Sequence, residues 1–212
     1  MIAVKRPSEV PAFMKSGIFL KMKRDLKKFY NVPQDQRRQQ KPPYIPFPAS
    51  VLEKIRTQLH KEFNGKCAYC ESLITISYQG DVDHFRPKSA ARGLTGEFSL
   101  DHYWPLAFDW RNMYLCCEIC NRYKVNWFPV DGSRANLKLN FQQIRATEKP
   151  YLIDPCHDNP EEYFQYRENG TITGVNERAK VSIDVLKLNR KDLLENRRIR
   201  IRDLNALLAK LI

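Results

Sequence analysis

Apolar side chains recur every three or four positions in four stretches of the chain, which is the spacing of one face of a helix. These stretches are residues 16–30, 50–65, 176–188 and 190–212. Ser50 and Glu53 have the spacing of a capping box, and Gly65 is suited to closing the second helix. The expected apolar stripes are Ile18, Met22, Leu26 and Phe29 in the first helix, Val51, Ile55, Leu59 and Phe63 in the second, and Leu194, Ile201, Leu204, Leu208 and Leu211 in the last.

Alternating polar and apolar positions predict only short strands. Residues 73–77 and 81–85, on either side of a turn at Gln79-Gly80, predict a hairpin. Residues 164–167 and 171–173 predict another, around the turn Glu168-Asn-Gly170. Residues 88–102 have no clear period and predict a loop placed over a substrate. The expected fold class is mainly α with a small β component.

Proline and charge suggest how the chain is divided. Residues 31–49 are rich in Gln, Arg and Pro, so they cannot continue a helix or a central strand and predict a linker or wrapping arm. We expect residues 1–49 to form a basic helix and a proline-rich arm. Residues 50–130 would then form the core, and residues 131–212 a helical C-terminal extension. The basic face of the first helix suits either a contact with DNA or a partner, or a solvated surface.

Four of the six cysteines form two Cys-x-x-Cys pairs, Cys67/Cys70 and Cys117/Cys120. Thiolates at this spacing suit a closed tetrahedral zinc site of structural type. The 46 residues between the pairs exceed the usual gap of a zinc ribbon, so the insert is expected to hold the chemistry. Cys116 and Cys156 are expected to be buried free thiols. The adjacent Cys156-His157 predicts a buried turn rather than a second metal site.

The net charge indicates which class of partner the protein binds. The 212 residues carry a formal net charge of +12, which favours a polyanion, although a basic surface also suits membranes or acidic proteins. No stretch approaches the roughly 20 apolar residues that would span a bilayer. Zinc knuckles instead of disulfides suit a reducing compartment, so the expected location is the cytoplasm.

The insert contains a set of residues suited to metal-dependent hydrolysis. Oxygen donors such as the Asp83 carboxylate and the Asn121 amide suit Mg²⁺ or Mn²⁺. His84, with an ordinary pKa near 6.5, could take a proton from an attacking water. Asn112 has donors and an acceptor with which it could bridge backbone groups and hold the strand of His84 in place.

Several motifs give the sequence a specific resemblance. They are Cys67-Ala-Tyr-Cys70, Asp81-Val-Asp-His-Phe-Arg-Pro-Lys88, Tyr103-Trp-Pro-Leu-Ala-Phe-Asp-Trp-Arg-Asn112, Cys117-Glu-Ile-Cys-Asn-Arg-Tyr-Lys124, Asp154-Pro-Cys-His-Asp-Asn-Pro-Glu-Glu162 and Val185-Leu-Lys-Leu-Asn-Arg190. Together they resemble the HNH endonucleases, and most of all the zinc-knuckle branch that includes the PtuB family, the nuclease subunits of Septu and retron-type anti-phage systems.

This resemblance implies a ββα-metal core stabilised by the four-cysteine zinc site and flanked by helices. It also implies DNA cleavage that leaves 5′-phosphate and 3′-hydroxyl ends. In that core His84 would be the general base, Asn112 would pin the hairpin loop, and Asp83 with Asn121 would bind the catalytic metal. Many relatives have His at the position of Asn121, and Asn there favours a hard cation. The expected phosphate contacts are Arg86, Lys88, Arg122 and Lys124.

Two other functions fit part of the sequence. A zinc-dependent nucleic-acid-binding module without catalysis would explain the knuckles and the charge, but not the full set of Asp83, His84, Asn112 and Asn121. An assembly subunit whose nuclease is silent until a PtuA-like ATPase partner docks is compatible with catalysis. Its signature would be the apolar side of the last helix.

Overall fold

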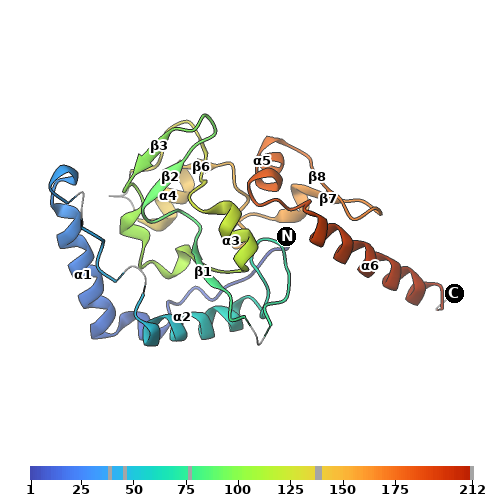
Figure 1. Ribbon diagram of the computed structural model, residues 1–212, viewed down its shortest axis with the longest axis horizontal. Helices are drawn as coiled ribbons and strands as arrows, with labels where there is room; N and C mark the ends of the chain where they lie inside the picture. Colours follow the sequence, from blue (N-terminus) through green and yellow to red (C-terminus); the bar gives the residue numbers. More distant parts are fainter. Residues whose placement is uncertain (38–39, 45–46, 76–77, 137–139, 211–212) are drawn as a thin grey trace.

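The computed structural model describes residues 1–37, 40–44, 47–75, 78–136 and 140–210. Within these ranges the fold is mainly helical with small two-stranded sheets, so the predicted fold class is confirmed. Figure 1 shows α1 at the left of the molecule, α2 along its bottom and α6 extending to the right. None of the described helices is both long enough and apolar enough to cross a membrane.

The two N-terminal helices are α1 (Gly17–Asn31) and α2 (Ala49–Glu62). The buried face of α2 is the expected one, because Val51, Ile55 and Leu59 are all buried. The buried face of α1 is rotated from the expected stripe and consists of Phe19, Met22, Leu26 and Tyr30, while Ile18 is exposed. The capping box at Ser50 was also wrong, because the residue that caps α2 is Pro48 and no side chain bonds to that end.

The middle of the molecule is a strand pair followed by a short helix. Strand β1 (Asp81–His84) pairs antiparallel with β4 (Met113–Cys116), and α3 (Glu118–Lys124) follows directly. The expected hairpin partner of β1, residues 73–77, was therefore wrong. Leu73 instead bridges Lys66, and residues 76 and 77 lie outside the described residues. Residues 121–124 form the second half of α3.

The long insert between β1 and β4 has more structure than its sequence suggests. Strands β2 (Ala90–Arg92) and β3 (Phe98–Leu100) form a hairpin where a loop was expected. Its turn includes Gly96 at φ +89°, a backbone conformation that glycine adopts without strain. Two 3₁₀ turns, η3 (Trp104–Leu106) and η4 (Trp110–Asn112), then lead the chain into β4.

The C-terminal third packs against this core through small elements. These are β5 (Val130–Asp131), α4 (Phe141–Thr147), β6 (Lys149–Pro150), η5 (Pro160–Glu162), β7 (Phe164–Tyr166) and β8 (Ile172–Gly174), followed by the helices α5 (Glu177–Val185) and α6 (Lys191–Leu208). The predicted hairpin is the β7–β8 pair, and the two predicted helices are α5 and α6. Helix α4, which begins at a capping box of Asn140 and Gln143, was not predicted.

The remaining short turns are η1 (Ala12–Lys15), which precedes α1, and η2 (Gln34–Arg37), which follows it. The expected apolar side of α6 is largely exposed, including Leu204 and Leu208, and the buried residue of this helix is Leu193. Leu211 lies outside the described residues. In Figure 1, α6 runs outward from the body, which explains why so little of it is covered.

Candidate metal centre and catalytic site

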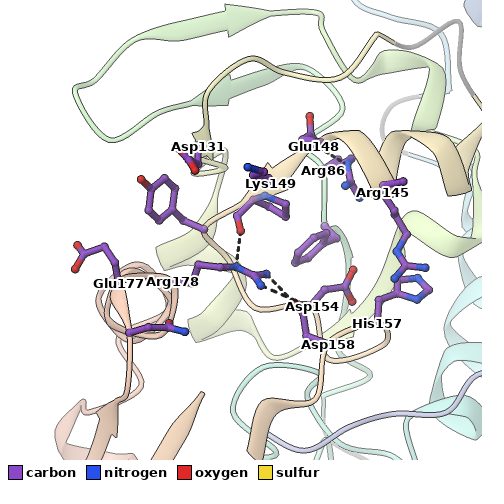
Figure 2. A pocket seen from close by; sticks show the side chains of 15 residues that line it. Arg86, Asp131, Arg145, Glu148, Lys149, Asp154, His157, Asp158, Glu177 and Arg178 are labelled. Atoms are coloured by element: carbon purple, nitrogen blue, oxygen red, sulfur yellow. Dashed lines mark hydrogen bonds and ion pairs between the residues drawn. The ribbon is translucent and has the colours of Figure 1, made fainter. Parts of the chain in front are cut away.

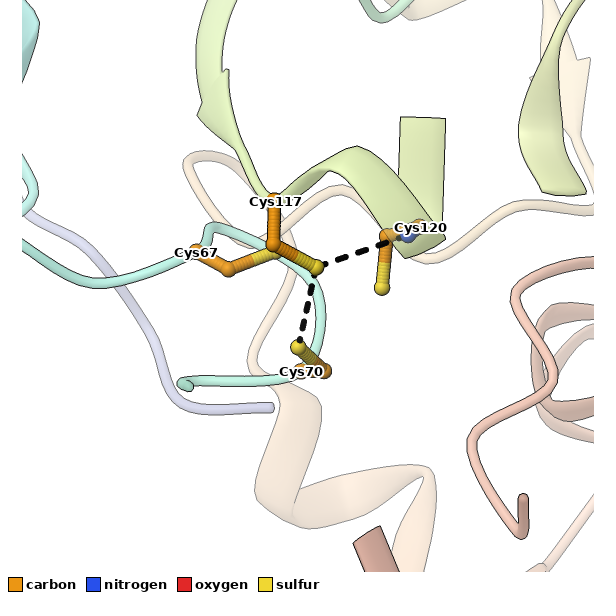
Figure 3. Close-up of side chains that lie close together, drawn as sticks. All are labelled: Cys67, Cys70, Cys117 and Cys120. Atoms are coloured by element: carbon orange, nitrogen blue, oxygen red, sulfur yellow. Dashed lines mark hydrogen bonds between the residues drawn. The ribbon is translucent and has the colours of Figure 1, made fainter. Parts of the chain in front are cut away.

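The four knuckle cysteines converge on one point. Cys67 and Cys70 lie in the turn after α2, Cys117 caps the N-terminus of α3, and Cys120 lies in its first turn. Their sulfur atoms all lie within 4.8 Å of one another, and the Sγ atoms of Cys70 and Cys117 are 3.7 Å apart (Figure 3). A tetrahedral zinc with Zn–S bonds of about 2.3 Å requires sulfurs about 3.8 Å apart. The cluster can therefore hold a metal, and its donors and size fit zinc.

The surroundings of the cluster favour thiolates. The backbone N–H of Cys120 donates to the Sγ of Cys117 over 3.4 Å. Arg190, the residue that caps α6, places Nη1 3.5 Å from the Sγ of Cys120 and Nη2 3.5 Å from the Sγ of Cys70. The pKa of Cys70 is lowered, mainly by its hydrogen bond with Cys117, whereas burial raises the pKa of Cys67 and the hydrogen bond with Cys117 raises that of Cys120. The pKa of Cys117 is also raised, so three of the four thiols would lose their protons to a bound metal. Four thiolates around a divalent cation carry two net negative charges, and Arg190 offsets part of that charge.

The ββα unit places His84 and Asn121 on one cavity. This cavity has a volume of about 460 Å³, and its wall includes Asp83, His84, Lys88, Asn121 and Arg122. A smaller adjoining cavity of about 180 Å³ shares His84, Lys88 and Asn121. The strand β1 supplies His84 at its last position and the helix α3 supplies Asn121, so the packing of α3 on β1 brings the two together.

His84 is buried and held in one orientation. Its Nε2 lies 2.9 Å from the carbonyl oxygen of Ala107, and a carbonyl only accepts, so Nε2 bears the hydrogen and Nδ1 keeps the lone pair. The ring of Phe47 stacks on the imidazole, with centroids 6.2 Å apart. Burial, and then the nearby Lys88, lower the pKa of His84 to about 3. The imidazole is therefore neutral near pH 7, with an unprotonated Nδ1.

Asp83 is buried and already engaged. The Tyr69 hydroxyl donates to Oδ2 over 2.5 Å, and the Lys124 ammonium lies 3.0 Å from Oδ2 and 3.2 Å from Oδ1. Because each carboxylate oxygen can accept two hydrogen bonds, Oδ2 is saturated and Oδ1 retains one acceptor position. Asp83 could give a metal that one position.

Asn121 is oriented by a neighbour that the sequence analysis did not select. Its Nδ2 donates to the Oδ2 of Asp81 over 2.8 Å, so its Oδ1 is left as an acceptor. Asp81 is two positions before Asp83 on β1, and such residues share one face of a strand. The alternation Asp81-Val-Asp83 was the signal that could have identified Asp81 as part of the site.

Asn112 bridges backbone groups on both sides of the insert. Its Oδ1 accepts the N–H of Arg86 over 2.8 Å, and its Nδ2 donates to the carbonyl of Arg86 over 3.0 Å and to that of Leu106 over 3.3 Å. The side chain is 1% exposed, so these bonds form away from water. They fix the backbone two residues after His84.

The four cations expected to contact phosphate divide into two groups. Lys88 and Arg122 lie on the cavity wall, where Lys88 is half-buried and Arg122 is exposed. Burial lowers the pKa of Lys88. Lys124 is fully buried against Asp83 and donates to the carbonyl of His84 over 2.8 Å. Lys124 is therefore a structural partner of the two site residues, and its predicted role in holding phosphate is corrected.

The predicted phosphate contact of Arg86 also requires correction. Its side chain is 2% exposed, and its Nε donates to the Oε1 of Glu148 over 2.7 Å. The guanidinium lies 5.4 Å from the ring centroid of Phe128 and 5.7 Å from that of Phe141. It faces away from the cavity of His84 and cannot contact a substrate phosphate there. The sequence signal was misleading because a basic residue beside a catalytic motif is usually exposed.

The other histidines and cysteines are not brought into the site. His60 contacts the carbonyl of Gln79, and His102 contacts the carbonyl of Ala135. Cys116 is a buried free thiol, whereas Cys156 is free and partly exposed. Both histidine contacts are with backbone oxygens, which fits a role in packing.

No family model matches the chain. It is 35% identical over 158 residues to a Septu protein PtuB of Bacillus mycoides, an alignment that covers 72% of this chain and 52% of that protein. The chain is related to the Septu proteins. It is also 37% identical over 148 residues to a Septu protein PtuA of the same organism, covering 69% of this chain and 20% of that protein.

A Septu protein PtuB of Bacillus thuringiensis is 28% identical over 141 residues, covering 66% of this chain and 43% of that protein. The chain thus spans about half the length or less of these Septu relatives. The alignment with the Septu protein PtuA covers only a fifth of that much longer protein. A module like this one therefore also occurs within proteins of that name.

Proposed function

We propose that the protein is a Mg²⁺- or Mn²⁺-dependent HNH endonuclease that hydrolyses DNA. One observation carries the proposal: His84 and the amide of Asn121, both in the ββα unit, line the same cavity. The hydrogen bond from Nε2 of His84 to the carbonyl of Ala107 leaves Nδ1 of the neutral ring unprotonated. A base and an oxygen donor on one cavity suit hydrolysis of a phosphodiester. The motif resemblance to HNH endonucleases supports the same conclusion.

Each residue has a distinct task in this proposal. Nδ1 of His84 accepts the proton of the attacking water, and the bond of Nε2 to Ala107 stabilises the charged ring that results. A divalent cation bound by Asp83 and Asn121 would hold the scissile phosphate and neutralise the charge on the leaving oxygen. The oxygen donors fit such a cation, since Oδ1 of Asp83 has an acceptor position left and Asp81 orients the amide of Asn121.

Two more residues complete the cavity. Lys88 and Arg122 lie on its wall and would bind the phosphates on either side of the cut. Lys124 would instead keep Asp83 charged and hold the end of β1 through the carbonyl of His84. Asn112 would keep the loop after His84 in place.

The net charge of the chain and its relatedness to the Septu proteins suggest its partners. The net charge of +12 and an exposed basic face on α1 suit a phosphate backbone; that face consists of Lys21, Lys23, Arg24, Lys27 and Lys28. Relatedness to Septu proteins supports a role in an anti-phage defence system, with a PtuA-like ATPase as the partner. We propose the cytoplasm as the location, because phage DNA is found there and knuckle thiols stay reduced.

A second candidate function is that of an assembly subunit. It is favoured by the exposed leucines on α6, because Leu204, Leu207 and Leu208 are each more than half exposed. Together with the outward course of this helix in Figure 1, they would suit docking of the ATPase. This function is compatible with catalysis.

A nuclease assay tests the proposal. Zinc-loaded protein would be incubated with supercoiled, linear, nicked and single-stranded DNA and with RNA, in Mg²⁺, Mn²⁺ or EDTA. Each reaction would be run with and without the ATPase partner. We expect divalent-cation-dependent cleavage of DNA. If folded, zinc-replete protein cleaves no substrate under any of these conditions, the catalytic proposal fails and the assembly function remains.

A further inference from the structure

A second cavity is larger than the one that His84 lines. It has a volume of about 590 Å³, within the roughly 300–1,000 Å³ typical of small-ligand sites. Helix α4, strand β6, the loop around Asp154 and the start of α5 surround it (Figure 2). Phe85 and Arg86, which directly follow His84, form part of its wall. It is therefore a separate chamber on the other side of the end of β1.

The guanidinium of Arg86 is incompletely paired in this chamber. Of its five N–H groups, only the Nε–H has an acceptor within the described residues, and Nη1 is buried without any hydrogen-bond partner. A buried charged donor without an acceptor is costly, and such a group commonly marks the place of an ion, a water or a ligand. The chamber that Arg86 lines is where such an acceptor would be.

Two further cations line the same chamber. Arg145 belongs to the last turn of α4 and Lys149 to β6, and both are exposed. Neither has an ion-pair partner among the described residues. Figure 2 shows Arg145 on the same side of the chamber as Arg86 and His157, with Lys149 near its upper edge. Three cations with unused donors therefore line one cavity.

Carboxylates also line the chamber, and most have other roles. Glu148 pairs with Arg86 and Asp158 pairs with Arg178, so these two charges are compensated. Asp131 and Glu177 lie on the side away from Arg145 (Figure 2).

Asp154 is, with Glu148, one of two buried carboxylates of this chamber. Its Oδ1 accepts from the Tyr114 hydroxyl and from the backbone N–H of Cys156. Its other oxygen makes no hydrogen bond within the described residues and could accept a hydroxyl or amine donor. The chamber thus offers donors on one side and an acceptor on its floor.

We propose that this chamber binds a small phosphate monoester of about the size of a mononucleotide. The phosphate group would contact Arg86, Arg145 and Lys149, which line one cavity, since several cations suit the three terminal oxygens of a phosphate. A donor on the rest of the ligand contacts Asp154. This proposal does not depend on the nuclease function, because none of its contacts involves His84, Asn121 or a divalent cation.

Calorimetry on the full chain tests the site, with deoxyadenosine 5′-monophosphate, inorganic phosphate and deoxyadenosine as three separate probes and no added divalent cation. We expect the monophosphate to bind at one site per chain and deoxyadenosine not to bind. Arg145→Ala and Lys149→Ala, both at exposed positions, should each weaken binding by about tenfold or more, as removal of a charge-assisted hydrogen bond does.

Two variants serve as matched controls. Arg200→Ala and Lys61→Ala remove exposed cations of α6 and α2, whereas Lys88→Ala tests whether the phosphate binds in the cavity of His84 instead. None of these substitutions should change binding. Binding by inorganic phosphate as tight as by the monophosphate supports the site and identifies free phosphate as its ligand. If neither phosphate probe binds at millimolar concentration, or if binding is lost in Lys88→Ala and kept in Arg145→Ala, the proposal is overturned and the chamber holds water.

Discussion

Replacing Asn112 by alanine should damage the protein through the backbone that its side chain holds. The two short bonds, to the N–H and the carbonyl of Arg86, are 2.8 and 3.0 Å long, and the third, to Leu106, is 3.3 Å. Each buried group left unsatisfied costs about 1–3 kcal/mol. Loss of the two short bonds should therefore lower the free energy of unfolding by about 2–6 kcal/mol, measured by urea denaturation with the zinc site loaded.

The same substitution should slow cleavage in a way that metal cannot repair. The backbone that Asn112 fixes is two residues from His84, and a displacement of about 1 Å at a reacting group can cost on the order of 10²-fold in rate. The comparison is Asn121→Ala, which removes one partly exposed bond to Asp81. This variant should stay close to wild-type stability, and raised Mn²⁺ should restore part of its rate by mass action.

A titration of Mn²⁺ against single-turnover rate separates the two roles. Rescue of Asn121→Ala alone is the expected result. Rescue of Asn112→Ala alone would show that the two roles are assigned the wrong way round. An Asn112→Ala protein as stable as wild type would refute the calculation from its hydrogen bonds.

Three further outcomes are expected. Cys70→Ser or Cys120→Ser should yield zinc-free, partly unfolded protein, while metal analysis of the wild type should find about one zinc per chain; a zinc-free double variant that still unfolds cooperatively would exclude a structural metal. Glu148→Ala should lower the free energy of unfolding by about 3–5 kcal/mol, because it leaves Arg86 buried without a counter-charge; weaker DNA binding at unchanged stability would contradict that assignment. Because burial lowers the pKa of His84 to about 3, the imidazole stays neutral well below its ordinary 6.5, so the single-turnover rate at pH 5.5 should be within about threefold of that at pH 7.5. A fall in rate centred near pH 6.5 would contradict a buried, neutral base.

Local patterns predicted the parts of the fold that depend on neighbours in the sequence. The stripe of Val51, Ile55 and Leu59 is buried as expected, since a helix needs only its own period to define a face. The β7–β8 hairpin formed around its Asn-Gly turn for the same reason. The partner of β1 could not be found in this way, because β4 lies about thirty residues further along and the intervening hairpin β2–β3 has no period of its own.

In the candidate site, too, local sequence predicted some features, and others depended on distant packing. Spacing alone predicted that the four cysteines would converge, and the sulfur cluster confirms it. The presence of a basic residue in the motif did not predict whether its side chain would be exposed and able to bind phosphate, because burial depends on packing with residues far away in the sequence. Lys124 reaches Asp83 and Arg86 reaches Glu148, and neither contact is visible in the local sequence. The roles of Asp81 and Arg190 were missed because each acts through another residue.

The most direct test of the proposed catalysis is the cleavage rate of His84→Ala. Loss of a general base should lower the single-turnover rate by about 10²–10⁴-fold, with zinc content and urea unfolding close to wild type, because His84 is not a sulfur ligand. The control is His60→Ala, which removes a histidine whose one hydrogen bond within the described residues is to the carbonyl of Gln79, and which should cleave at the wild-type rate. Cleavage by well-folded His84→Ala within a few-fold of wild type would contradict the proposed mechanism.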